Sequence, residues 1–168
     1  MIVGGGVVGC ETAHWLANEY GKNVTVLEML PHFMMGVCTA NRGHLLHYLE
    51  KSGVRLYNCT KVKALAKDGV YVEQNQSQTV PDPYNTWQPL LPPNIPNPME
   101  KAIKEEIVEK KIPADLIVLA MGGKADETFF FEAGEEHLAK EMYNIGDSSR
   151  AGRVLEAVRG AYHLAVRI

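Results

Sequence analysis

The stretch Met1-Ile2-Val3-Gly4-Gly5-Gly6-Val7-Val8-Gly9-Cys10-Glu11-Thr12-Ala13 decides the fold of this chain. It joins an apolar strand stub, a G-x-G-x-x-G turn at Gly4, Gly6 and Gly9, and the start of a helical pattern. Because glycine has no Cβ, the backbone amides of such a turn can approach a pyrophosphate closely. The following helix presents unpaired N–H groups and the positive end of its dipole to the same anion. The motif therefore predicts a dinucleotide-binding turn.

An acidic residue stands where this motif requires one. Residues 23–28 form a second apolar, β-branched run that ends on Glu28, 19 residues after Gly9. The helix predicted between them, Val7–Tyr20, ends at Gly21, which suits a left-handed C-cap. A carboxylate at this position accepts hydrogen bonds from an adenosine ribose and repels a 2′-phosphate. No arginine follows Glu28 directly, so the sequence favours NAD(H) over NADP(H).

The composition excludes several classes of function. The chain has 168 residues, of which 46% are hydrophobic and 22% charged, which is ordinary for one globular domain. A net charge of −3 argues against a nucleic-acid partner, and no apolar run is long enough to span a membrane. The start lacks the basic segment of a signal peptide, so we expect a cytoplasmic protein. The cysteines Cys10, Cys38 and Cys59 are expected to be reduced, and the scattered histidines predict no metal site.

The next part of the chain predicts a helix, a strand and an antiparallel meander. Residues 41–52 carry apolar side chains at helical spacing and are followed by Gly53 as a cap, and residues 54–57 form a third strand. Two alternating runs, 61–65 and 70–72, flank Lys67-Asp68-Gly69, a strong hairpin signal. The apolar positions of the helix are Leu45, Leu46, Tyr48 and Leu49.

Residues 75–98 are a proline-rich insertion. Seven of the nine prolines lie there, so neither a helix interior nor a central strand is expected. We interpret the segment as a surface excursion held by Tyr84, Trp87 and Leu90, with partner docking as the less favoured alternative. Residues 101–111 fit either a helical turn or a further strand of the meander.

The last part returns to the parallel sheet. The continuous apolar run 115–120 predicts a strand covered on both faces, and Gly122 and Gly123 follow it at the edge where α/β folds bind ligands. A short strand is expected at 142–145 and a closing helix at 152–168. The fold class is thus α/β: a three-layer, Rossmann-like parallel sheet flanked by helices, with an antiparallel β-meander as a crossover.

Three stretches resemble the pyridine-nucleotide region of bacterial NADH:flavin oxidoreductases of the 2,4-dienoyl-CoA reductase and 2-enoate reductase group. Residues 3–13 are similar to the G-G-G-x-x-G-x-E-x-A fingerprint of the NAD domain, and residues 26–31 to the end of its second strand. Residues 143–147 and 153–158 are similar to the stretch where the chain returns to the FAD domain. The likeness covers nearly all of the chain except the insertion.

This resemblance implies roles for further residues. Glu11 matches a glutamate near the nicotinamide end, and Asp147 matches an aspartate that contacts FAD. With the turn and the sheet edge, the predicted cofactor-binding residues are Gly4, Gly5, Gly6, Val7, Val8, Gly9, Glu11, Glu28, Met29, Gly122, Gly123 and Asp147. No catalytic residue is assigned, because the cofactors carry the redox chemistry.

The resemblance also implies a larger parent protein. Relatives carry a (β/α)₈ barrel with FMN, an iron–sulfur cluster and the first half of an FAD domain, none of which is encoded here. We therefore expect residues 1–168 to be an excised NADH-binding domain, inactive alone, with residues 142–168 as the return segment toward the FAD domain. Its partners would be the remaining domains, and a homodimer stays open.

Two other functions remain open at this point. Glu28 would suit the ribose of FAD as well as that of NADH, so the chain could be an FAD-binding module. It could also be a non-enzymatic module that holds ADP as a structural plug, with the proline-rich insertion as its interaction surface. The double-glycine start with Glu11 favours NADH.

Overall fold

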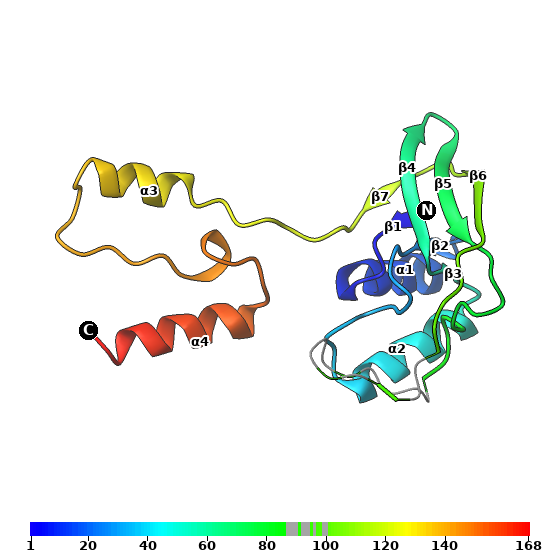
Figure 1. Ribbon diagram of the computed structural model, residues 1–168, viewed down its shortest axis with the longest axis horizontal. Coiled ribbons are helices and arrows are strands. Elements are labelled where there is room, and N and C mark those ends of the chain that lie inside the picture. The colour runs from blue at the N-terminus through cyan, green and yellow to red at the C-terminus, as the bar shows by residue number, and fades with distance from the viewer. Residues whose placement is uncertain (87–90, 92–94, 96, 99–100) are drawn as a thin grey trace. The chain divides into compact units, whose positions relative to one another are not determined.

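The computed structural model describes residues 1–86, 91, 95, 97–98 and 101–168. The chain divides into two compact units, Met1–Met121 and Gly122–Ile168, which are described separately (Figure 1). The described residues of the first unit form two helices and two sheets, and the second unit, described in full, holds two α-helices and a short 3₁₀ turn.

A parallel sheet forms the centre of the first unit. Its strand order is β3-β2-β1-β7, in which β1 spans Ile2–Val3, β2 Thr25–Leu27, β3 Arg55–Tyr57 and β7 Val118–Leu119. The register places Ile2 opposite both Val26 and Val118, and Val26 opposite Leu56. These partners share one face of the sheet, because side chains alternate along a strand.

Two helices cover that face. α1 spans Val7–Tyr20 and α2 Thr39–Lys51, and both pack their apolar residues on the sheet (Figure 1). The predicted bounds of α1 are confirmed, and Gly21 ends it in the left-handed conformation with φ +58°. The fully buried members of this core are Ile2, Cys10, Ala13, Val26, Phe33, Leu46 and Leu49. Tyr48 is 39% exposed, so it does not belong to the buried stripe that we predicted for α2.

The antiparallel meander covers the opposite face. β4 (Thr60–Ala66), β5 (Gly69–Asn75) and β6 (Ile107–Pro113) pair in the order β4-β5-β6. β5 buries Val70 and Val72 against Leu27 of the parallel sheet, with Tyr57, the register partner of Leu27, packed beside them. The unit therefore has three layers, helices, parallel sheet and antiparallel sheet, and the predicted α/β class is confirmed.

The hairpin and the strand alternative for residues 101–111 are both confirmed. Ala66 pairs with Gly69, so Lys67 and Asp68 form the two-residue connection. Residues 107–113 extend the sheet as β6 rather than a helical turn. A Cβ on Gly69 would lie 3.0 Å from the Cα of Pro113, so β6 can approach β5 here only because this residue is glycine.

The proline-rich insertion is anchored by Tyr84, as predicted. Its hydroxyl donates a hydrogen bond to the carbonyl of Val54 and accepts one from the amide of Leu56 at 3.2 Å. The Nδ2 of Asn58 donates to the carbonyl of Pro81 at 2.8 Å. The other two predicted anchors, Trp87 and Leu90, lie outside the described residues.

Two predictions for the last part of the chain are wrong. β7 is parallel to β1, as predicted, but it forms an edge of the sheet, and Leu119 is 55% exposed instead of buried on both faces. Residues 142–145 form no strand, because in the second unit, described in full, no strand is present to pair with them.

The second unit is helical. α3 (Thr128–Glu135) was not predicted, whereas α4 (Val154–Ala165) confirms the helix expected at the end. The 3₁₀ turn η1 spans Gly146–Ser148. α4, described over its whole length, has no buried residue, so it closes no core within this unit.

Candidate nucleotide-binding site

The glycine turn lies where β1, α1 and β7 meet. Gly4 adopts φ +108°, and a Cβ there would lie 2.7 Å from the carbonyl carbon of Ala120. A Cβ on Gly9 would lie 3.1 Å from the carbonyl carbon of Gly4. The amide of Gly4 donates to the carbonyl of Leu27 at 2.8 Å, which ties the turn to β2. Only glycine at both positions allows strand and helix to come this close.

The space in front of α1 fits an anion. Gly6 is the exposed N-cap residue, and no described heavy atom lies within 4 Å of the position that a Cβ would take there. The first amides of a helix, here Val7, Val8 and Gly9, have no carbonyl partner within the helix. α1, which the structure describes in full, has neither a capping side chain nor an acidic residue in its first turn. A phosphate would find free donors and the positive end of the helix dipole.

Glu28 stands beside this turn, at the end of β2. Its Oε2 accepts a hydrogen bond from the amide of Gly5 at 2.7 Å, and its Oε1 accepts one from the amide of Leu30 at 2.8 Å. A carboxylate has about four acceptor sites, so each oxygen keeps capacity for a further donor such as a ribose hydroxyl. The carboxylate is half-buried and held on both oxygens, which fixes the direction in which it can accept.

The other predicted residues of the first unit surround the same turn. Val8 is 68% exposed and Met29, which follows Glu28, is 64% exposed. Glu11 lies exposed one turn farther along α1. The structure thus brings together the glycines, the start of α1 and Glu28, and leaves apolar side chains accessible around them.

The three remaining predicted residues belong to the second unit. Gly122, at φ +84°, and Gly123 are exposed and follow Met121, the last residue of the first unit. Asp147 is exposed in η1, where its Oδ1 accepts a hydrogen bond from the amide of Gly152 at 3.2 Å. Their assignment to a cofactor stays a prediction.

A segment that the sequence did not single out packs under the turn. Two ring carbons of Phe33 would lie within 3.0 Å of a Cβ on Gly5, and the amide of Met34 donates to the carbonyl of Gly5 at 2.8 Å. Arg42 on α2 is 3% exposed and donates from Nε to the carbonyl of Phe33 at 2.9 Å. Arg42 lies on the same helical stripe as Leu46 and Leu49. A charged residue within this apolar stripe is the sequence signal that could have pointed to Arg42.

Cys10 is a structural thiol in the core behind the turn. It is fully buried, and burial, with a smaller contribution from the nearby charge of Glu28, raises its pKa to about 12. Because the thiolate is the reactive form, the side chain is inert at neutral pH. All three cysteines are free thiols, as predicted.

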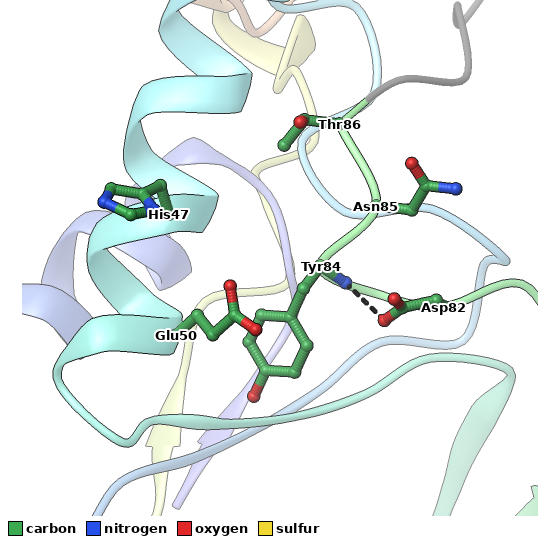
Figure 2. A pocket seen from close by; sticks show the side chains of 6 residues that line it. All are labelled: His47, Glu50, Asp82, Tyr84, Asn85 and Thr86. Atoms are coloured by element: carbon green, nitrogen blue, oxygen red, sulfur yellow. Dashed lines mark hydrogen bonds between the residues drawn. The ribbon is translucent and has the colours of Figure 1, made fainter.

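A separate polar pocket of about 280 Å³ lies between α2 and the start of the insertion (Figure 2). His47 and Glu50 line it from the helix, and Asp82, Tyr84, Asn85 and Thr86 line it from the loop. It shares no residue with the glycine turn.

Among the described residues, no group of three histidine, cysteine or acidic side chains could hold a metal ion. Of the helices that the structure describes, none is long and apolar enough to cross a membrane.

Characterised proteins similar to this chain are several times longer. An NADH oxidase of Thermoanaerobacter brockii is 26% identical over 168 residues, which is 100% of this chain and 21% of that protein. A cinnamate reductase of Clostridium sporogenes is 23% identical over 171 residues, again 100% of this chain and 21% of that protein. A bilirubin reductase of Mediterraneibacter gnavus is 27% identical over 163 residues, covering 96% and 20% of the two chains. The chain thus spans about a fifth of the length of these relatives.

Solved structures share the fold over nearly the whole chain. A 2-naphthoyl-CoA reductase in complex with 2-naphthoyl-CoA matches 99% of this chain and 20% of its own, with a TM-score of 0.70 and 24% identity. Histamine dehydrogenase from Rhizobium sp. 4-9 matches 99% of this chain and 21% of its own, with a TM-score of 0.68 and 14% identity. At such identities these likenesses show the fold alone.

A family model connects these similarities with the glycine turn. It covers residues 1–150, which include the turn, Glu28, the meander and η1 with Asp147. Together with the relatives, this match confirms the resemblance to the nucleotide-binding region of NADH:flavin oxidoreductases that the sequence predicted. The chain belongs to the pyridine nucleotide-disulphide oxidoreductase family and forms a dinucleotide-binding module of flavoprotein type.

Proposed function

We propose that this chain binds NADH and positions its nicotinamide for hydride transfer to a flavin held by another part of a multidomain oxidoreductase. The observation that carries the proposal is the hydrogen bond from the amide of Gly5 to the Oε2 of Glu28, at 2.7 Å. It joins the two parts of the motif, the pyrophosphate turn and the ribose-binding acid, in one site. The names of two relatives, NADH oxidase and cinnamate reductase, support reductive chemistry driven by NADH.

In this proposal each part of the site has one task. The amides of Val7 and Val8 and the dipole of α1 bind the pyrophosphate, while the absence of a Cβ at Gly6 leaves room for it. Glu28 accepts hydrogen bonds from the adenosine ribose and repels a 2′-phosphate. The nicotinamide of the bound cofactor supplies the hydride.

The remaining predicted residues would act at the other end of the cofactor. Glu11 faces solvent on α1 and would orient the nicotinamide end, and Gly122 and Gly123 would take part in cofactor binding as glycines that follow a strand of the parallel sheet. Asp147 would contact FAD at the boundary with a neighbouring domain. These roles rest on the resemblance to the NADH:flavin oxidoreductases.

The proposed partners are further domains of a longer protein. The chain matches about a fifth of each relative, so the relatives have room for a catalytic domain and an FAD domain beside this module. By the resemblance, the catalytic domain would carry FMN and an iron–sulfur cluster.

Calorimetric titration of the 168-residue chain with NADH, NADPH, FAD and ADP tests the proposal. We expect NADH to bind more tightly than NADPH, and FAD to bind weakly or not at all. A preference for NADPH would contradict the role of Glu28, and binding of FAD alone would make the chain a flavin module. Tight binding of ADP that excludes NADH would favour a structural plug.

A charge reversal at the acid sharpens this test. Glu28→Arg should weaken NADH binding about tenfold and lower the NADH/NADPH preference by more than that, because a cation attracts the 2′-phosphate. Glu28→Gln, which keeps an acceptor oxygen, separates the loss of charge from the loss of the contact with Gly5. Glu19→Arg, an exposed charge reversal near the far end of α1, is the matched control and should leave the preference unchanged. An unchanged ratio in Glu28→Arg would remove Glu28 from the site.

A further inference from the structure

Arg42 is a buried cation for which the proposed function gives no reason. It is 3% exposed on α2, and none of the ion pairs between described residues includes it. Its Nε donates to the carbonyl of Phe33 at 2.9 Å, and its Nη1 lies 3.5 Å from the carbonyl of Asn85. Burying a charge is unfavourable unless hydrogen bonds compensate for the lost water. We therefore infer that the N–H groups of the Arg42 guanidinium have a task at the carbonyl oxygens that they bind.

The carbonyl that Arg42 binds belongs to the peptide group that supports the glycine turn. The peptide between Phe33 and Met34 accepts the guanidinium hydrogen bond with its oxygen and donates to the carbonyl of Gly5 with its N–H, at 2.8 Å. A cation on the oxygen polarises this peptide and strengthens its N–H as a donor. Arg42 thus acts on Gly5 through one peptide group.

The local backbone shows that this peptide is held in an unusual orientation. Met34 adopts φ +52°, a left-handed conformation that side chains with a Cβ seldom take, and it is 2% exposed. Such a residue keeps its conformation only where its surroundings fix it. The hydrogen bonds from Arg42 and to Gly5, and the burial of Phe33, supply that constraint.

Gly5 passes the constraint on to the carboxylate. Its carbonyl is held by Met34, its α-carbon lies against the ring of Phe33, and its amide donates to the Oε2 of Glu28. A shift of the 33–34 peptide would therefore move the donor that orients the Glu28 carboxylate.

We propose that Arg42 is a positioning residue for nucleotide selection: through the peptide between Phe33 and Met34 it fixes Gly5, and through Gly5 the direction of the Glu28 carboxylate. The inference rests on the proposed function, because it assigns Glu28 to the ribose. It predicts that the choice between NADH and NADPH depends on a residue of α2 that touches neither cofactor nor carboxylate.

The test compares Arg42→Met, which keeps the length and apolar stem but removes the donors, with Arg42→Lys, which keeps the charge and one donor. Lys51→Met, an exposed cation on the same helix, is the matched control. Binding of NADH and of NADPH to the 168-residue chain is measured by calorimetry for each variant. We expect Arg42→Met to lower the NADH affinity about tenfold and the NADH/NADPH ratio about fivefold. Arg42→Lys should restore most of the ratio, and Lys51→Met should not change it.

The outcomes show whether Arg42 positions the Glu28 carboxylate or only stabilises the fold. Equal losses for both nucleotides, with the ratio kept, would overturn the inference while leaving the proposed function intact. A wild-type chain that binds neither nucleotide would overturn the proposed function itself. If Arg42→Met does not fold, Arg42→Gln replaces it, because it keeps a polar side chain but removes the cation that polarises the peptide between Phe33 and Met34. An unchanged ratio in that variant also overturns the inference.

Discussion

The first unit buries Ile2, Leu46 and Leu49 completely, whereas in the second unit Phe129 is 76% exposed and Val154 81% exposed. In the second unit, described in full, Ala133 is the one buried residue. Burial of apolar surface is the main favourable contribution to folding. The first unit therefore holds its glycine turn on a core of its own, while the apolar side chains of the second contribute little to its stability.

Two glycines of the turn in the first unit differ from two glycines in the helices of the second unit. In the first, Gly4 and Gly9 stand where any Cβ would meet backbone atoms of a neighbouring segment. In the second, Gly134 in α3 and Gly160 in α4 have no described atom within 4 Å of a Cβ position. Glycine is thus a geometric requirement at the turn and merely a flexible residue in these helices.

The largest difference between the two units is expected in the free energy of unfolding when one leucine of each is shortened to alanine. Leu46→Ala leaves a cavity beneath the parallel sheet, and we expect it to lower the free energy of unfolding by about 2–5 kcal/mol. The matched variant Leu155→Ala, in α4, removes a side chain that is half exposed, and the expected loss is below about 1 kcal/mol. Urea denaturation followed by far-UV circular dichroism, which reports the helices of both units, measures both. Equal losses would mean that α4 is buried in solution.

Adding a methyl group should have opposite effects in the two units. Gly9→Ala forces α1 away from β1, and we expect about 1–3 kcal/mol of destabilisation together with loss of most of the NADH affinity. Gly160→Ala should instead stabilise α4 by about 0.5–1 kcal/mol, because alanine loses less backbone entropy in a helix. Thermal denaturation and NADH titration of both variants check this. Normal NADH binding by Gly9→Ala would contradict the turn geometry.

The sequence was sufficient to predict those parts of the fold that depend on residues close together along the chain. The turn at Gly4 to Gly9, the bounds of α1 and the hairpin at Asp68 are encoded by residues that are neighbours along the chain. The 19-residue spacing predicts that Glu28 lies beside the turn, as the structure has it, because one helix and one strand bring the chain back to this edge of the sheet.

Other features depend on contacts between distant parts of the chain. The apolar run 115–120 resembles a central strand, but β7 within it lies at an edge of the sheet, which leaves Leu119 exposed. Residues 142–145 have strand-like side chains, yet a strand requires a pairing partner. The arginine in the apolar stripe of α2 is a local signal, but the support of Gly5 by Phe33 and Arg42 links two loops and a helix, so these contacts could not be predicted from the sequence.

The smallest effect is expected for a substitution at the start of α4, where hydrogen bonds join residues that are close neighbours along the chain. The carboxylate of Glu156 accepts hydrogen bonds from the amide of Arg153 at 3.0 Å and from its Nη2 at 2.7 Å. These contacts lower the pKa of Glu156 to about 2. A depressed pKa means that the cap is fully formed above the ordinary value near 4.5 and is lost as the pH falls through about 2.

Glu156→Ala should therefore speed amide exchange in the first turn of α4 a few-fold, as measured by hydrogen exchange and NMR, and the unfolding of the first unit should not change. Glu156→Gln keeps an acceptor and should exchange at a rate between those of the alanine variant and the wild type. In the wild-type chain the protection should persist from pH 7 to about 3 and disappear toward pH 2. A parallel loss of NADH affinity in Glu156→Ala would show that the two units are coupled, because the cap lies entirely within the second unit.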